Sequence, residues 1–112
     1  MLVAIVLFAL AAVGGLIMAV MRFRGREQPP MALALLHGGA AASGLIALFV
    51  ALTGGPMGGL PLWALILFVG AALGGFVLFS SHLRKRALPI PLMVVHALVA
   101  VTAFLLLVAS QL

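Results

Sequence analysis

The feature that most constrains this chain is the near absence of charge from four long apolar runs. All six basic residues and the single acidic residue, Glu27, lie in two short connectors between these runs. Hydrophobic residues make up 67% of the 112 residues and charged residues only 6%, whereas a soluble domain is about one quarter charged. A water-soluble surface cannot be built from this composition, so the sequence predicts an integral membrane protein.

The lengths of the apolar runs predict helices that cross the bilayer. A helix needs about 20 apolar residues to span the hydrocarbon core, and residues 2–21, 30–52, 60–81 and 89–111 meet this requirement. Pro30 and Pro89 fall at the start of the second and fourth spans, where a helix does not need the N–H that proline lacks. We therefore predict an all-α fold, a transmembrane four-helix bundle that forms one membrane domain over residues 1–112.

The basic residues predict the orientation of this bundle. They are confined to two connectors, 22–29 and 82–88, and comprise Arg22, Arg24, Arg26, Arg84, Lys85 and Arg86. Basic connectors remain in the cytoplasm, so both termini and the uncharged connector 53–59 are expected on the periplasmic side of a bacterial-type inner membrane. The positive charge then signals topology and contact with bilayer lipid, and we do not expect nucleic acid as a partner.

The two halves of the sequence align with each other. Spans one and three match at an offset of 60, and spans two and four at an offset of 59. The first alignment pairs Ala4, Phe8, Ala11, Gly14 and Gly15 with Ala64, Phe68, Ala71, Gly74 and Gly75, and the second pairs Pro30, His37 and Ala41 with Pro89, His96 and Ala100. The units 1–52 and 60–111 are therefore predicted to be two tandem helical hairpins, related by a pseudo-two-fold axis along the membrane normal.

This symmetry brings two histidines to one depth in the bilayer. His37 and His96 each follow the opening proline of their span by seven residues, or roughly 10 Å of helix. The positions four and seven residues further on share the same helix face and are small: Ala41 and Gly44 after His37, Ala100 and Ala103 after His96. The glycine pairs of spans one and three are expected to help those helices approach the same region.

A flat cofactor between the helices explains this pattern. A haem iron takes an axial histidine from each side, so His37 and His96 are candidate metal ligands. Ala41, Gly44, Ala100 and Ala103 would leave space for the macrocycle, and Gly14, Gly15, Gly74 and Gly75 would let the helices close around it. Basic groups near the membrane face would neutralise the haem propionates; the candidates are Arg22, Arg24, His82, Arg84 and Arg86. The chain has no cysteine, which excludes covalent c-type attachment and iron–sulfur clusters.

Other interpretations of the same residues remain open. Small residues also let transmembrane helices pack, with histidines hydrogen-bonded across them, and buried imidazoles can handle protons or ions. His82 occupies the repeat position equivalent to Arg22 and is expected to be a partly wet interfacial histidine. Its alternative roles are a propionate partner, a contact to a quinone headgroup, or a second ligand.

Four short spans with paired histidines on the second and fourth resemble the small transmembrane b-type cytochromes, such as the cytochrome b561-like bundles. The resemblance covers the architecture and His37 and His96. It implies non-covalent haem b and electron transfer with a quinone or a redox protein, by an electron carrier rather than an enzyme with its own substrate. The chain lacks histidines near the outer helix ends, so one chain cannot build the second haem site of the usual two-haem pattern.

Two further classes compete with the cytochrome hypothesis. Small multidrug transporters also have four spans, but none of the spans here contains the carboxylate that proton exchange needs. A structural or accessory subunit without a cofactor requires only packing and remains the main alternative. The sequence leaves open the redox partner and whether two chains form a homodimer.

Overall fold

The computed structural model describes all residues, 1–112, and is entirely helical. The four helices are α1 (Leu2–Phe23), α2 (Met31–Thr53), α3 (Gly59–Leu83) and α4 (Ile90–Ala109). Each begins and ends within two residues of its predicted span. The predicted all-α four-helix bundle is confirmed, with the helices packed as the pairs α1–α2 and α3–α4.

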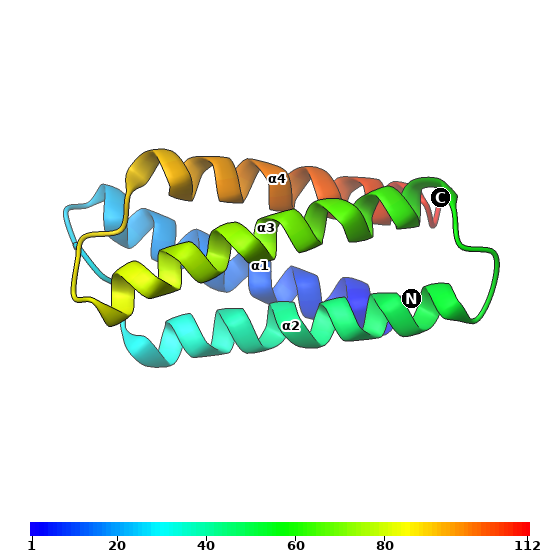
Figure 1. Cartoon of the computed structure of the whole chain (residues 1–112), viewed down its shortest axis with the longest axis horizontal. Coiled ribbons are helices and arrows are strands. Elements are labelled where there is room, and N and C mark those ends of the chain that lie inside the picture. The colour runs from blue at the N-terminus through cyan, green and yellow to red at the C-terminus, as the bar shows by residue number, and fades with distance from the viewer.

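The two ends of the bundle differ in character. The connectors α1–α2 and α3–α4 lie together at one end, which we call the basic end because it carries every arginine and lysine. Both termini and the α2–α3 connector lie at the opposite end, which we call the terminal end (Figure 1). The bundle is 44 Å long and about half as wide, and all four helices are long and apolar enough to cross a membrane.

The helices leave the basic end through equivalent turns. After α1, Arg26 N–H donates to Met21 O across the helix end, and Gly25 has a left-handed φ of 97°. After α3, Arg86 N–H donates to Ser81 O in the same way, but the left-handed position is Lys85, with φ of 55°. Glycine adopts this conformation without the steric conflict of a Cβ atom, so the second turn is the more strained of the two.

The helices lie around a square. The closest backbone contacts are within each hairpin, and the contacts between hairpins, α2 with α3 and α1 with α4, are fewer. No Cα atoms of α1 and α3, or of α2 and α4, come within 8 Å of each other. These two helix pairs therefore occupy the diagonals, and only side chains can meet across the bundle axis.

The core of the terminal half is apolar and follows the sequence repeat. Phe8 of α1 and Phe68 of α3 stack across one diagonal, with ring centroids 3.7 Å apart and planes 2° from parallel. Equivalent residues surround the stack and are fully or almost fully buried: Ala4 with Ala64 and Leu48 with Leu107. Most other large apolar side chains point outward, including Leu36 and Phe76, which are 71% and 70% exposed. An outward apolar surface of this kind matches a lipid environment.

Candidate cofactor site

The two histidines of the sequence repeat meet across the second diagonal of the bundle. His37 of α2 and His96 of α4 have ring centroids 6.2 Å apart, and their planes make an angle of 75°. Because the backbones of α2 and α4 are not in contact, the imidazoles are the groups that reach toward the axis. Both side chains are partly buried.

Each imidazole is held by its own hairpin. His37 Nδ1 lies 2.7 Å from the carbonyl oxygen of Ala11, and His96 Nδ1 lies 2.7 Å from that of Ala71. A carbonyl oxygen only accepts hydrogen bonds, so Nδ1 carries the proton in both rings. In the neutral imidazole this leaves Nε2 with a free lone pair. The second nitrogen of each ring is therefore available to a metal or a proton donor.

The glycine pairs of α1 and α3 provide the space for these rings. A Cβ atom at Gly15 would lie 3.0 Å from His37 Cε1, and one at Gly75 would lie 3.3 Å from His96 Cε1. Such distances are shorter than most real Cβ contacts. The paired glycines thus let the imidazoles pack directly against the backbone of the neighbouring helix. The sequence assigned them to closing the helices around a cofactor, whereas here Gly15 and Gly75 directly contact the ligand candidates.

The strip of small residues beyond His37 has a different neighbour from the one expected. A Cβ atom at Gly44 would lie 3.0 Å from Phe8 Cε1, and the equivalent Ala103 is fully buried in the core cluster that contains Phe68. The space at Gly44 therefore receives an aromatic ring, and the expectation that it accommodates a macrocycle is revised. Ala41 and Ala100, one turn from the histidines, remain partly exposed.

The residues expected to serve propionates divide into two groups. Arg22 and His82 are engaged with backbone carbonyls: Arg22 Nε donates to Leu88 O at 2.9 Å, and His82 Nε2 donates to Pro29 O at 2.7 Å. Three others, Arg24, Arg84 and Arg86, are exposed at the basic end. His82 is only 8% exposed rather than partly wet, because it packs beneath the connectors and beside Phe79.

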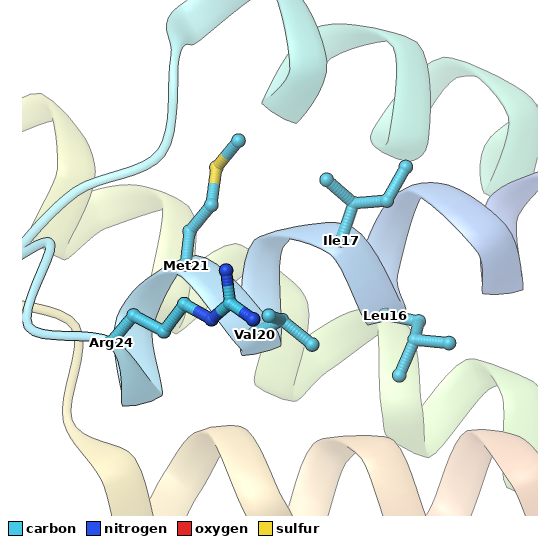
Figure 2. Close-up of a pocket in the computed structure, with 5 residues that line it drawn as sticks. All are labelled: Leu16, Ile17, Val20, Met21 and Arg24. Carbon is cyan, nitrogen blue, oxygen red and sulfur yellow. The ribbon is translucent and has the colours of Figure 1, made fainter.

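The surface of the bundle has shallow apolar grooves. One lies along α1 and is lined by Leu16, Ile17, Val20, Met21 and Arg24 (Figure 2). Another lies between α2 and α3 and is lined by Leu45, Ile46, Phe49, Leu65 and Val69. Neither groove is lined by His37 or His96.

The donor set limits what the histidine pair can hold. No group of three or more His, Cys, Asp or Glu side chains comes together anywhere in the structure. A structural zinc site uses four protein ligands, and a catalytic one three. A haem iron needs only axial ligands from the protein, because the macrocycle supplies the other four. Two imidazoles with free Nε2 atoms therefore suit haem better than a bare ion.

Comparisons with known proteins identify no relative. No family model matches the chain, and neither a curated protein nor a solved structure matches it.

Sequence reasoning missed the groups that hold the histidines. Ala11 and Ala71 align in the repeat, yet they act through backbone carbonyls, which any residue type would provide. Phe8 and Phe68 also align, and the offset of 60 was the signal available for their contact.

Proposed function

We propose that this protein is a membrane b-type haem protein and electron carrier, with His37 and His96 as the two axial ligands. The observation that carries the proposal is the pair of imidazoles, each fixed through Nδ1 to a carbonyl and each with a free Nε2, at 6.2 Å between centroids. Histidine ligands of metals almost always donate their other ring N–H to a carbonyl or carboxylate, which fixes their tautomer and orientation.

The separation of the rings supports ligation of a single metal atom. With histidine–metal bonds of about 2.0–2.1 Å and the radius of each ring added, two imidazoles on opposite sides of one metal have centroids about 6 Å apart. The separation of 6.2 Å between His37 and His96 is compatible with this value, and it also falls within the range of an edge-to-face ring contact, which the accessory-subunit alternative requires. A direct hydrogen bond between the rings would need a different arrangement, and none is present.

The surroundings set where a macrocycle would lie. On the terminal side the Phe8–Phe68 stack closes the core, so the space must come from the interface between hairpins at the level of the histidines. Over their whole length, the two hairpins make fewer backbone contacts with each other than the two helices within a hairpin do, and Ala11, Ala41 and Ala100 near the histidines are small. The exposed Arg24, Arg84 and Arg86 at the basic end are candidates to neutralise propionates.

Bound haem supplies one-electron chemistry by cycling between the ferric and ferrous states. His37 and His96 would hold the iron, their apolar neighbours would exclude water from it, and a quinone or a redox protein in the membrane would exchange the electrons. We place the basic end in the cytoplasm and both termini in the periplasm of a bacterial-type inner membrane, because basic connectors are retained on the cytoplasmic side. One histidine pair gives one haem per chain.

The alternative function is that of a structural or accessory subunit without a cofactor. A specific observation favours it: each imidazole is already hydrogen-bonded to a carbonyl and packed against glycine. Histidines satisfied in this way can serve helix packing alone.

The absorption spectrum of protein purified in detergent from haem-replete cells separates these functions. We expect a Soret band and, after reduction, sharp α and β bands. His37→Ala and His96→Ala should each abolish these bands, while His82→Ala, which removes the third histidine but neither proposed ligand, should retain them. A colourless preparation that stays colourless with added haemin contradicts the haem proposal and supports the accessory subunit.

A further inference from the structure

All hydrogen bonds between the two hairpins lie at the basic end. Two of them use equivalent residues: Arg22, at the end of α1, donates to Leu88 O, and His82, at the end of α3, donates to Pro29 O. Two more join the connectors, from Leu88 N–H to Glu27 O at 3.0 Å and from Gln28 Nε2 to Arg86 O at 3.0 Å. The bonds of His37 and His96, by contrast, stay within a hairpin.

The two accepting carbonyls occupy a particular place. Pro29 and Leu88 immediately precede Pro30 and Pro89, the residues that cap α2 and α4. Both are buried, and the helical hydrogen bonds begin only one residue later, at Pro30 O and Pro89 O. A buried carbonyl without a hydrogen-bond partner destabilises the fold, because it has lost its hydrogen bonds to water. Arg22 and His82 each remove this destabilisation for the opposite hairpin and fix the start of its second helix.

Those two helices carry the histidine pair. His37 and His96 lie seven residues from Pro30 and Pro89, and a helix transmits a shift of its first turn along roughly 10 Å with little change. We infer that Arg22 and His82 are positioning residues: as a crossed brace, they set the separation of α2 and α4 and thereby the distance between His37 and His96. The consequence for haem rests on the proposed function, but the effect on the separation of α2 and α4 does not.

The two arms of the brace use different side chains, the guanidinium of Arg22 and the imidazole of His82. His82 Nδ1 is buried and has no hydrogen-bond partner, so the brace uses only the Nε2–H of this ring. An arginine at position 82 has an Nε–H to donate, as Arg22 does at the equivalent position. His82→Arg should therefore preserve the brace, whereas His82→Ala leaves Pro29 O without its donor.

The chain contains no cysteine, so a pair of spin labels can test this inference directly. Leu36 and Val95 are exposed, at 71% and 57%, and each precedes one of the histidines. In an L36C, V95C background, electron–electron distance spectroscopy measures the separation of α2 and α4 in detergent, without haem. With Arg22 and His82 in place, the distribution of distances between the two labels should be narrow. His82→Ala or Arg22→Ala should broaden this distribution and increase the mean distance.

Two variants complete the experiment. His82→Arg should restore the narrow distribution, and Ser81→Ala, whose hydroxyl bonds within α3 to Val77 O, should leave it unchanged. If His82→Ala fails to fold, Gln28→Ala can replace it. This variant removes the exposed hydrogen bond from Gln28 Nε2 to Arg86 O at the basic end and should broaden the distance distribution by a smaller amount. Distances unchanged in the alanine variants, or no rescue by arginine, overturn the inference. A colourless wild-type protein would contradict the haem proposal. The separation of α2 and α4 could still be measured, because the spin-label experiment does not need haem.

In haem-loaded protein the brace has a second readout. His82→Ala should keep the haem bands but shift the reduction potential and the ferric electron paramagnetic resonance spectrum, because the two imidazoles that would hold the iron would no longer be fixed relative to each other. His82→Arg should return both to the wild-type values. Shifts of the same size in Ser81→Ala would contradict a specific role for His82.

Discussion

Two aromatic pairs cross the bundle axis, and they are built in opposite ways. Phe8 and Phe68 stack in parallel at 3.7 Å and close the terminal half of the core. His37 and His96 are 6.2 Å apart at a steep angle, and each is bonded to its own hairpin rather than to its partner. The phenylalanine layer joins the hairpins by direct stacking, whereas in the histidine layer each ring is hydrogen-bonded to and packed against its own hairpin.

Under the proposed function, the phenylalanine layer gives stability and the histidine layer carries the chemistry. Dispersion between tightly packed rings stabilises the bundle, and such a layer gains nothing from a ligand. Imidazoles with a free Nε2 lower their energy when a metal binds. Variants that affect one layer and not the other test whether this division is real.

We expect the largest loss of stability from Phe8→Ala. Removal of a buried phenylalanine typically costs about 3–5 kcal/mol, and Phe8 is 4% exposed and packed on Phe68 and Gly44. Titration of the detergent-solubilised protein with a denaturing detergent, followed by circular dichroism, measures the loss. Phe76→Ala is the matched control, since Phe76 is 70% exposed; equal losses in the two variants would show that the stack does not join the hairpins.

Gly44→Ala should destabilise the same layer by a smaller amount. The new methyl group would lie 3.0 Å from Phe8 Cε1, and overpacking of this kind costs about 1–3 kcal/mol. The same titration provides the value. Gly38→Ala serves for comparison because its Cβ would meet nothing within 4 Å, and a Gly44 variant as stable as this one would contradict the close fit.

In the histidine layer, Gly15→Ala should lower haem affinity by about tenfold, the lower end of the range for changes around metal ligands. Its methyl group would lie 3.0 Å from His37 Cε1, so the ring must move. Titration of the apoprotein with haemin measures the affinity. Gly14→Ala is the control, because its methyl group would lie 3.6 Å from His37 Cβ, an ordinary contact, and this variant should bind haemin as the wild type does. An equal loss of haemin affinity in Gly14→Ala would contradict a specific contact between Gly15 and the His37 ring.

The smallest effect on stability should come from His37→Ala in the apoprotein. The change removes one hydrogen bond to Ala11 O, worth about 0.5–1.5 kcal/mol, from a side chain that is only partly buried. Denaturation of the haem-free protein checks this value. A loss as large as that of Phe8→Ala would mean that the imidazole is there to hold the bundle together, as the accessory-subunit alternative requires.

The fold, and which positions of the two halves correspond to each other, could be predicted from the sequence. Apolar runs, connector composition and the offsets of 60 and 59 predicted four helices and paired positions such as Phe8 with Phe68 and His37 with His96. These signals depend on residue type and spacing. They do not report depth of packing, and His82 illustrates this, because the sequence placed it at a wet boundary while the structure buries it.

The surroundings of the site could not be predicted in the same way. A small residue leaves space without specifying which neighbour fills it, so Gly44 was assigned to a cofactor although Phe8 occupies the space. Likewise, the acceptors Ala11 O and Pro29 O are backbone atoms. Backbone acceptors impose no requirement on residue type, and they become visible only when the helices are placed.

The central claim, that His37 and His96 ligate one iron, is tested most directly by electron paramagnetic resonance of the oxidised, haem-loaded protein. Imidazole planes at the observed 75° predict a low-spin ferric signal of the strongly anisotropic type that near-perpendicular axial ligands produce, lost in both His37→Ala and His96→Ala. A high-spin signal in the wild type, or a low-spin signal that survives either substitution, would contradict the account.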